Sequence, residues 1–166
     1  MKKYILFFCL MALSTVVLFN CNNPSQKLEA NKKLIQHFTE ATNKANWDAF
    51  DKLLTVDFKR HCQATPNAQI NSREDFKALQ KSFQKSMPDQ KISVEMLIAE
   101  GDKVAAYATY TGTLTGPMGE FPATGKSADS KFITIFRIEK GRIAEIWVEW
   151  DNLNMFTQLG LFPSQK

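Results

Sequence analysis

Histidine, cysteine and glycine are scarce in this chain, and their scarcity excludes several kinds of site. The 166 residues include two histidines, three cysteines and seven glycines. His37 and His61 lie far apart in the sequence, and the chain contains neither an HExxH motif nor closely spaced cysteines. The sequence therefore predicts no metal site. The glycines follow no phosphate-binding pattern, so no nucleotide-binding loop is predicted either.

The chain also lacks a concentrated charge of either sign. Its formal net charge is +4, and basic residues are scattered between acidic ones without forming a basic stripe. Nucleic-acid binding depends on clustered lysine and arginine side chains. We therefore expect no nucleic-acid partner.

A long hydrophobic run occurs only at the N-terminus. Lys2 and Lys3 precede a mostly apolar run over residues 4–19, which is shorter than the ~20 residues that a membrane-spanning helix needs. This pattern is typical of a signal peptide, which we place at residues 1–20.

The residues that follow indicate a lipid anchor. Leu18-Phe19-Asn20-Cys21 resembles the lipobox of bacterial lipoproteins, in which a lipid is attached to the cysteine. The polar residues 21–27 would then form a flexible tether. We expect an extracytoplasmic, membrane-anchored lipoprotein of the bacterial cell envelope, bound to the membrane through lipid on Cys21. The alternative is an ordinary signal peptide cut nearby, which leaves Cys21 as a free thiol.

The remaining chain, residues 28–162, has the length of one domain with a single core. With Cys21 acylated, Cys62 is the one thiol left, so no internal disulfide can form. Cys62 is not expected to act as a nucleophile with His61, because adjacent residues of a strand point to opposite faces.

Hydrophobic periodicity changes near Pro88, from a helical period before it to a period of two after it. Apolar spacing predicts two helices within residues 27–54 and another that begins at the cap Ser72. The order predicts an α+β fold with a curved antiparallel sheet and N-terminal helices packed on its concave face. The expected strands lie within residues 55–63 and 92–151, and a last short helix covers 153–159.

The last predicted strand separates its side chains into two sets at a period of two. One set combines carboxylates with an indole, which suits a partly wet, concave wall. We expect this set to face a cavity: Ile143, Glu145, Trp147, Glu149 and Asp151. The other set is wholly apolar and is expected in a packed layer or at a dimer interface: Ala144, Ile146, Val148 and Trp150.

Several short stretches, in their order and spacing, resemble the SnoaL-type polyketide cyclase and ester cyclase branch of the nuclear transport factor 2-like superfamily. The resemblance covers nearly all of the mature chain. The matching stretches include Met87-Pro88-Asp89, Ala99-Glu100-Gly101-Asp102, Thr111-Gly112-Thr113, Pro122-Ala123-Thr124-Gly125-Lys126, Gly141-Arg142-Ile143-Ala144-Glu145 with Trp147 and Asp151, and Gln158-Leu159-Gly160.

This resemblance implies a cone-shaped α+β barrel that is often a homodimer and works without a cofactor. It implies that Asp151 removes an acidic proton next to a carbonyl group. It also implies that His61 donates a hydrogen bond or proton that stabilises the enolate oxygen.

Two functional hypotheses remain open at this point. In the first, the protein is a cyclase, isomerase or hydrolase that acts on a small, mostly apolar carbonyl compound through Asp151 and His61. In the second, the same fold is a lipoprotein that holds a small ligand or takes part in an assembly without turnover. The residues expected to shape the pocket are Trp147, Tyr107, Tyr110, Met118, Phe121 and Glu149.

Overall fold

The computed structural model describes residues 23–65 and 68–162. The predicted signal peptide and the lipidation residue Cys21 therefore lie outside the described residues. The helices are α1 (Pro24–Asn43), η1 (Trp47–Ala49), α2 (Phe50–Leu53), α3 (Arg73–Ser86) and α4 (Asn152–Gln158). The strands are β1 (Leu54–His61), β2 (Lys91–Glu100), β3 (Lys103–Thr113), β4 (Ser127–Glu139) and β5 (Arg142–Trp150).

The five strands form one sheet in the order β1-β5-β4-β3-β2. The α+β class is confirmed. One pair, β1 with β5, is parallel, whereas the other three pairs are antiparallel. The order of elements along the chain does not predict the parallel pairing of β1 with β5. These strands are separated by most of the domain, and no short turn fixes their relative direction.

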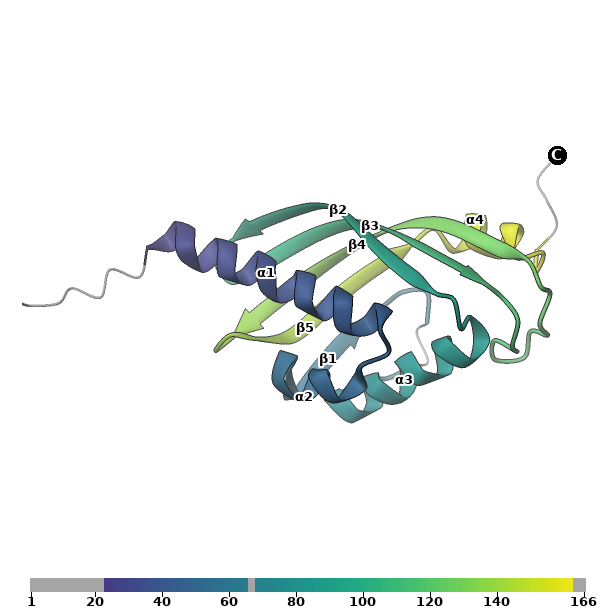
Figure 1. The fold of residues 1–166 in the computed structure, drawn as a ribbon, viewed down its shortest axis with the longest axis horizontal. Helices are drawn as coiled ribbons and strands as arrows, with labels where there is room; N and C mark the ends of the chain where they lie inside the picture. Colours follow the sequence, from purple (N-terminus) through teal and green to yellow (C-terminus); the bar gives the residue numbers. More distant parts are fainter. Residues whose placement is uncertain (1–22, 66–67, 163–166) are drawn as a thin grey trace, which may run out of the picture.

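Helices α1, α2 and α3 all pack on the same face of this curved sheet (Figure 1). The core between the two layers is rich in phenylalanine, with Phe50, Phe58 and Phe76 almost completely buried. The ring of Phe76 lies 4.8 Å from that of Phe58 and 5.8 Å from that of Phe50, measured between centroids. Aromatic packing therefore joins α3 to β1 and α2.

The N-terminal segment differs from the expected flexible tether, because the chain is helical from Pro24 onwards. The side chain of Asn23 accepts a hydrogen bond of 3.1 Å from the backbone N–H of Ser25 and caps α1. Pro24 follows at the first helical position, where its missing N–H costs nothing. Within the described part of the chain, no helix is both long and apolar enough to cross a membrane.

Strand β5 does not alternate regularly, because a bulge lies near its start. Arg137 pairs with Glu145 and Ile138 pairs with Ile143, so that Ala144 is the extra residue. As a result Ile143 and Ala144 are both buried. The expectation that Ile143 shares a face with Glu145 is therefore wrong.

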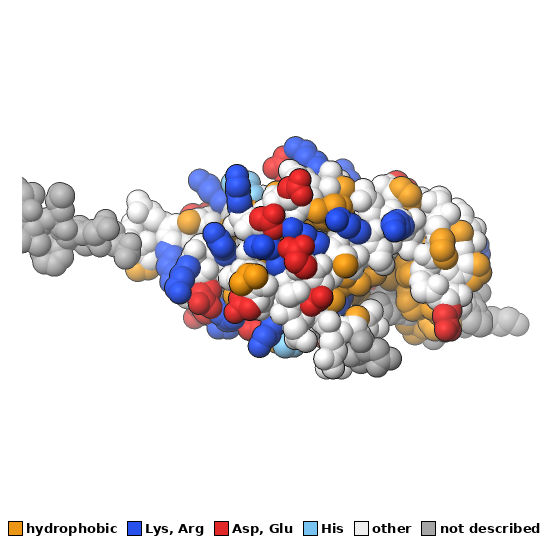
Figure 2. Space-filling model, turned by 90° about the horizontal axis from the view of Figure 1, so that it is seen from below, with side chains coloured by type: hydrophobic (Ala, Val, Ile, Leu, Met, Phe, Trp, Pro, Cys, Tyr) orange, Lys and Arg blue, Asp and Glu red, His pale blue; other side chains and the backbone are white. Residues whose placement is uncertain are grey.

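The two faces of the sheet have different chemistry. The face without helices exposes large apolar side chains, namely Met96, Ile98, Tyr107, Ile133 and Ile135. The side of the molecule that carries α3 shows acidic and basic side chains interspersed, and apolar side chains gather towards the end where α4 lies (Figure 2). No single-sign field extends over this view, in keeping with the scattered charges of the sequence.

Candidate functional site

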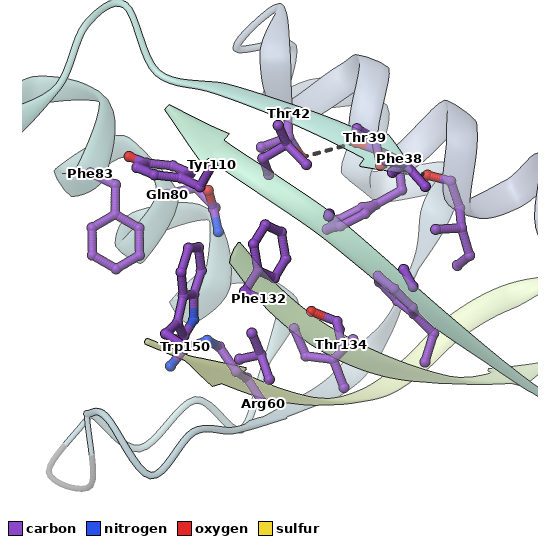
Figure 3. Close-up of a pocket in the computed structure, with 18 of the residues that line it drawn as sticks. Phe38, Thr39, Thr42, Arg60, Gln80, Phe83, Tyr110, Phe132, Thr134 and Trp150 are labelled. Atoms are coloured by element: carbon purple, nitrogen blue, oxygen red, sulfur yellow. Dashed lines mark hydrogen bonds between the residues drawn. The ribbon is translucent and has the colours of Figure 1, made fainter. Parts of the chain in front are cut away.

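A cavity made of two adjacent chambers, which share part of their walls, lies between the helices and the sheet. Arg60, Phe83, Tyr110 and Trp150 line both chambers and therefore lie where the two meet; Figure 3 shows these four side chains at the wall of the inner chamber. The inner chamber extends between α1, α3 and the sheet, and its walls include Phe38, Thr39, Thr42, Gln80, Ala108, Phe132, Thr134 and Val148. The outer chamber lies beside α4, and its walls include Cys62, Ala64, Met118, Asn152, Met155 and Phe156.

The chambers are small. The inner one has a volume of about 70 Å³ and the outer one of about 90 Å³. A single water needs only about 10–15 Å³ by such a measure. Each chamber therefore has room for a group larger than one water molecule.

The cavity contains few groups that can exchange a proton. Among the described residues that line the two chambers there is no histidine, aspartate or glutamate. The hydroxyl groups of Thr39 and Thr42 donate to carbonyl oxygens one turn earlier in α1, at 3.0 and 2.9 Å. The lining therefore offers binding groups rather than an evident acid–base pair.

Tyr110 is the buried phenol at the junction of the chambers. Its hydroxyl donates a hydrogen bond of 2.9 Å to the side-chain oxygen of Gln90. Burial, with a further contribution from the negative charge of Asp89, raises the pKa of Tyr110 far above its ordinary value. Tyr110 therefore stays neutral and can position a ligand oxygen, but it does not serve as a base.

Among the described lining residues Arg60 is the one cation, and it was not among the expected site residues. Only 9% of its surface is exposed, and its Nη1 donates to Oγ1 of Thr65 at 2.9 Å. Burial lowers the pKa of Arg60. The alternation of side chains along β1 could have located Arg60. Because Phe58 lies in the core, residues two and four positions later, Arg60 and Cys62, are expected on the same inner face.

Asp151 does not occupy the expected position. Its side chain is exposed, and Oδ1 accepts a hydrogen bond of 3.0 Å from the backbone N–H of Asn154, which caps α4. It lines neither chamber. The expectation that this carboxylate faces the apolar cavity is wrong, because the chain leaves the sheet after Trp150 and turns into α4. Its role as a base stays a prediction.

His61, Trp147 and Glu149 lie on the opposite face of the sheet, around an open polar groove. The ring of His61 stacks on Trp147 at 5.2 Å between centroids, and its Nε2 lies 2.7 Å from Oε1 of Glu145. Burial alone would raise the pKa of Glu145, but hydrogen bonds from His61 and Arg137 hold that pKa below its ordinary value. His61 and Asp151 therefore share no cavity.

The face assignment of β5 was wrong for a physical reason. The helices cover one face of the sheet, and the cavity between the two layers is apolar. The apolar set of Ile146, Val148 and Trp150 therefore faces the cavity, while the set with carboxylates faces outward. The apolar residues of β5 that were expected in a packed layer therefore also form the wall of the cavity.

The other predicted pocket residues are divided between the two faces. Tyr110 and Met118 line the cavity. Phe121 lies nearby, 37% exposed, with its ring 5.8 Å from that of Phe156. Tyr107 points outward from the open face of the sheet, where Lys131 lies above its ring.

The capping role of Asp151 leads to a direct prediction. Asp151→Ala removes the side-chain acceptor and is expected to lower the free energy of unfolding by about 1 kcal/mol. Asp151→Asn keeps an oxygen for the N–H of Asn154 and is expected to change stability by a few tenths of a kcal/mol at most. Urea unfolding followed by circular dichroism measures both. Equal losses in the two variants would show that the charge, and not the cap, stabilises this position.

The described part of the chain holds no group of three or more histidine, cysteine, aspartate or glutamate side chains that could bind a metal ion.

Comparison with known proteins identifies relatives over most of the chain. The family model described as SnoaL-like polyketide cyclase matches residues 32–159. Among solved structures, TsrD from Streptomyces laurentii is 28% identical, with a TM-score of 0.73 over 81% of this chain and 97% of that chain. IdmH from Streptomyces antibioticus is 26% identical, with a TM-score of 0.70 over 78% of this chain and 98% of that chain.

A more distant structure shares the fold alone. An LEH-like epoxide hydrolase of M. tuberculosis is 16% identical, with a TM-score of 0.66 over 81% of this chain and 92% of that chain. A search of curated proteins finds no significant match.

Proposed function

The chain belongs to the SnoaL-like polyketide cyclase family, and from this premise we propose that it binds a small, mostly apolar carbonyl compound in the two-chambered cavity. One observation carries the proposal: the cavity has mostly apolar walls, and Arg60, where the chambers meet, is the one cation among its described lining residues. Such walls take up a hydrocarbon body, and a few polar groups orient it.

Arg60 supplies the polar contact in this arrangement. Its guanidinium carries more N–H groups than the one that donates to Thr65. A carbonyl oxygen near Arg60 would accept from these groups, and the positive charge would stabilise negative charge that develops on that oxygen. The apolar part of the ligand would then lie in the inner chamber, between Phe38 and Phe132.

Proton abstraction by Asp151 is the catalytic form of this proposal. The family name supports it, and Asp151 directly follows Trp150, which lines both chambers. The carboxylate would have to leave the N–H of Asn154 to reach a ligand. The alternative, a lipid-anchored protein that holds its ligand without turnover, is supported by the lack of a carboxylate or imidazole among the described lining residues.

Binding can be tested with phenylacetone, a one-ring ketone, by isothermal titration calorimetry. We expect saturable binding to the wild type, and a loss of at least tenfold in Ala108→Leu, because the larger side chain fills the inner chamber. Ala105→Leu makes the same change on the outer face of β3 and is expected to bind normally. Equal affinity of both variants would contradict the proposed location.

Turnover can be tested with the same compound. Phenylacetone has acidic protons next to its carbonyl, and their exchange with deuterium from heavy water is visible by proton NMR. If Asp151 is the base, the wild type accelerates this exchange and Asp151→Asn loses the acceleration, while its affinity is unchanged. Binding without accelerated exchange in the wild type would support the alternative function.

A further inference from the structure

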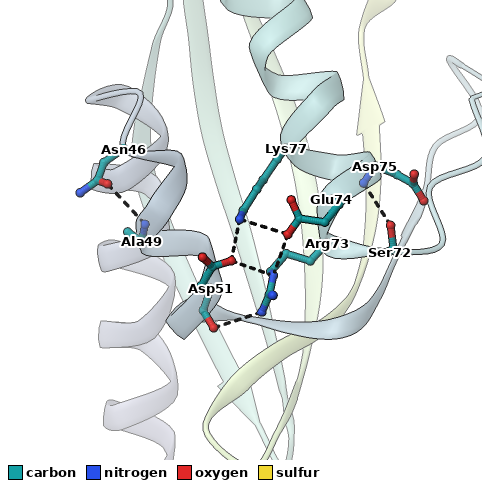
Figure 4. Close-up of polar contacts among 8 residues, drawn as sticks. All are labelled: Asn46, Ala49, Asp51, Ser72, Arg73, Glu74, Asp75 and Lys77. Atoms are coloured by element: carbon teal, nitrogen blue, oxygen red, sulfur yellow. Dashed lines mark hydrogen bonds and ion pairs between the residues drawn. The ribbon is translucent and has the colours of Figure 1, made fainter.

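Two cations of the described residues have little exposed surface, and their surroundings differ. Lys77 is 9% exposed, and its Nζ lies 2.6 Å from Oδ1 of Asp51 and 3.1 Å from Oε1 of Glu74. Figure 4 shows that the carboxylates of Asp51 and Glu74 contact both Lys77 and Arg73. The two carboxylates thus balance the positive charges of Lys77 and Arg73 together.

Arg60 is equally buried, at 9% exposed, but has no such balance. Its Nη1 donates to the neutral hydroxyl of Thr65, and the neighbouring thiol of Cys62 also favours its charged form. None of the ion pairs of the described residues includes Arg60, although Arg73 and Arg137 each pair with carboxylates. A buried charge without a counter-ion is strongly unfavourable, so its retention calls for a partner.

The surroundings of Arg60 indicate where that partner would come from. Its side chain points into the cavity, on the side where Trp150 lies (Figure 3). The described lining supplies no carboxylate to either chamber. Because the walls are apolar, an anion beside the guanidinium would interact with it much more strongly than in water.

We propose that the ligand of this cavity is a small monocarboxylate with an apolar body, whose carboxylate pairs with Arg60. This inference rests on the proposed function and narrows its ligand class from carbonyl compounds in general to acids. The planar guanidinium matches a carboxylate in shape and can hold it through two parallel hydrogen bonds. A single cation among apolar walls suits one negative charge, not the two or more of a phosphate ester.

The shape of the cavity fits the same ligand. Arg60 lies at the junction, so a carboxylate there leaves the inner chamber for a ring or short chain between Phe38, Phe132 and Val148. Burial lowers the pKa of Arg60, and a bound carboxylate would oppose that effect by favouring the charged guanidinium.

Two probes of nearly equal shape test the proposal. Phenylacetate and phenylacetone differ in that one carries a carboxylate where the other carries a methyl ketone. At pH 7 we expect the wild type to bind phenylacetate on the order of tenfold more tightly, or better, by isothermal titration calorimetry. Arg60→Met should lose this preference, because it removes the charge and keeps an apolar side chain of similar length.

Lys59→Met is the matched control, since Lys59 precedes Arg60 on β1 and is exposed on the opposite face. This variant makes the same change in net charge and should keep the preference for phenylacetate. Thermal unfolding without ligand gives a second readout. Arg60→Met is expected to unfold at the same or a higher temperature than the wild type, because it removes an unbalanced buried charge.

The possible outcomes separate this inference from the proposed function. Tighter binding of phenylacetate that depends on Arg60 and not on Lys59 supports both. Equal binding of the acid and the ketone overturns the carboxylate ligand and leaves the carbonyl-binding cavity standing. Failure of both probes to bind the wild type overturns both proposals.

Discussion

Phe76→Ala is expected to lower the free energy of unfolding by about 3–5 kcal/mol, a large part of the roughly 5–15 kcal/mol that stabilises a typical domain. Phe76 is 2% exposed, and its ring lies within 6.1 Å of the rings of Phe38, Phe50 and Phe58, measured between centroids. It thus connects α3 to α1, α2 and β1. Its removal leaves a hole that four separate elements would have to fill.

Urea unfolding followed by circular dichroism measures this loss. Phe121→Ala is the matched control, because it removes the same side chain from a position that is 37% exposed and is expected to cost about 1 kcal/mol or less. A loss below about 1 kcal/mol in Phe76→Ala would show that the aromatic cluster does not hold the helices on the sheet. The variant should also bind ligand less tightly, since Phe76 is part of the inner chamber wall.

Gly116→Ala is expected to disturb both stability and the outer chamber, although it adds a single methyl group. A Cβ atom at Gly116 would lie 2.3 Å from the backbone oxygen of Lys85 at the end of α3. The backbone N–H groups of Thr115 and Gly116 donate to the backbone oxygen of Ser86 at 3.0 and 2.9 Å, and Oγ of Ser86 donates to the backbone oxygen of Pro117 at 2.6 Å. The methyl group would separate these partners.

With about 1 kcal/mol for each hydrogen bond, we expect a loss of about 2–3 kcal/mol in the free energy of unfolding. Ligand affinity should fall as well, because Met118 on the same loop is a wall of the outer chamber. Gly119→Asn is the control on this loop: Gly119 has a φ of +59° and open space around it, and asparagine tolerates that conformation. A loss in Gly119→Asn as large as in Gly116→Ala would argue against the steric explanation.

Much of the fold was predictable because its signals are local. The expected cap Ser72 does accept from the backbone N–H of Asp75, and Asn46 accepts from that of Ala49 in the same way. The change from helical period to a period of two near Pro88 marks the start of the run from β2 to β5. Such patterns depend on neighbouring residues and survive in any tertiary arrangement.

The site was less predictable because it depends on which face of the sheet the helices cover. A period of two divides a strand into two sets but does not state which set faces inward. For β5 we expected the set with carboxylates to face the cavity. The bulge at Ala144 also breaks the regular alternation on which that expectation depends. On β1 the same period would have placed Arg60 inside, because it lies two residues after the buried Phe58.

The early start of α1 has a consequence for a chain anchored through Cys21. In the sequence only Asn22 separates that cysteine from the cap Asn23, and α1 then continues for 20 residues, about 30 Å. Its first turn lies at one end of the molecule and α4, beside the outer chamber, lies at the other (Figure 1). If Cys21 carries a lipid, the start of α1 would lie at the membrane, and the outer chamber beside α4 would lie at the far end of the domain.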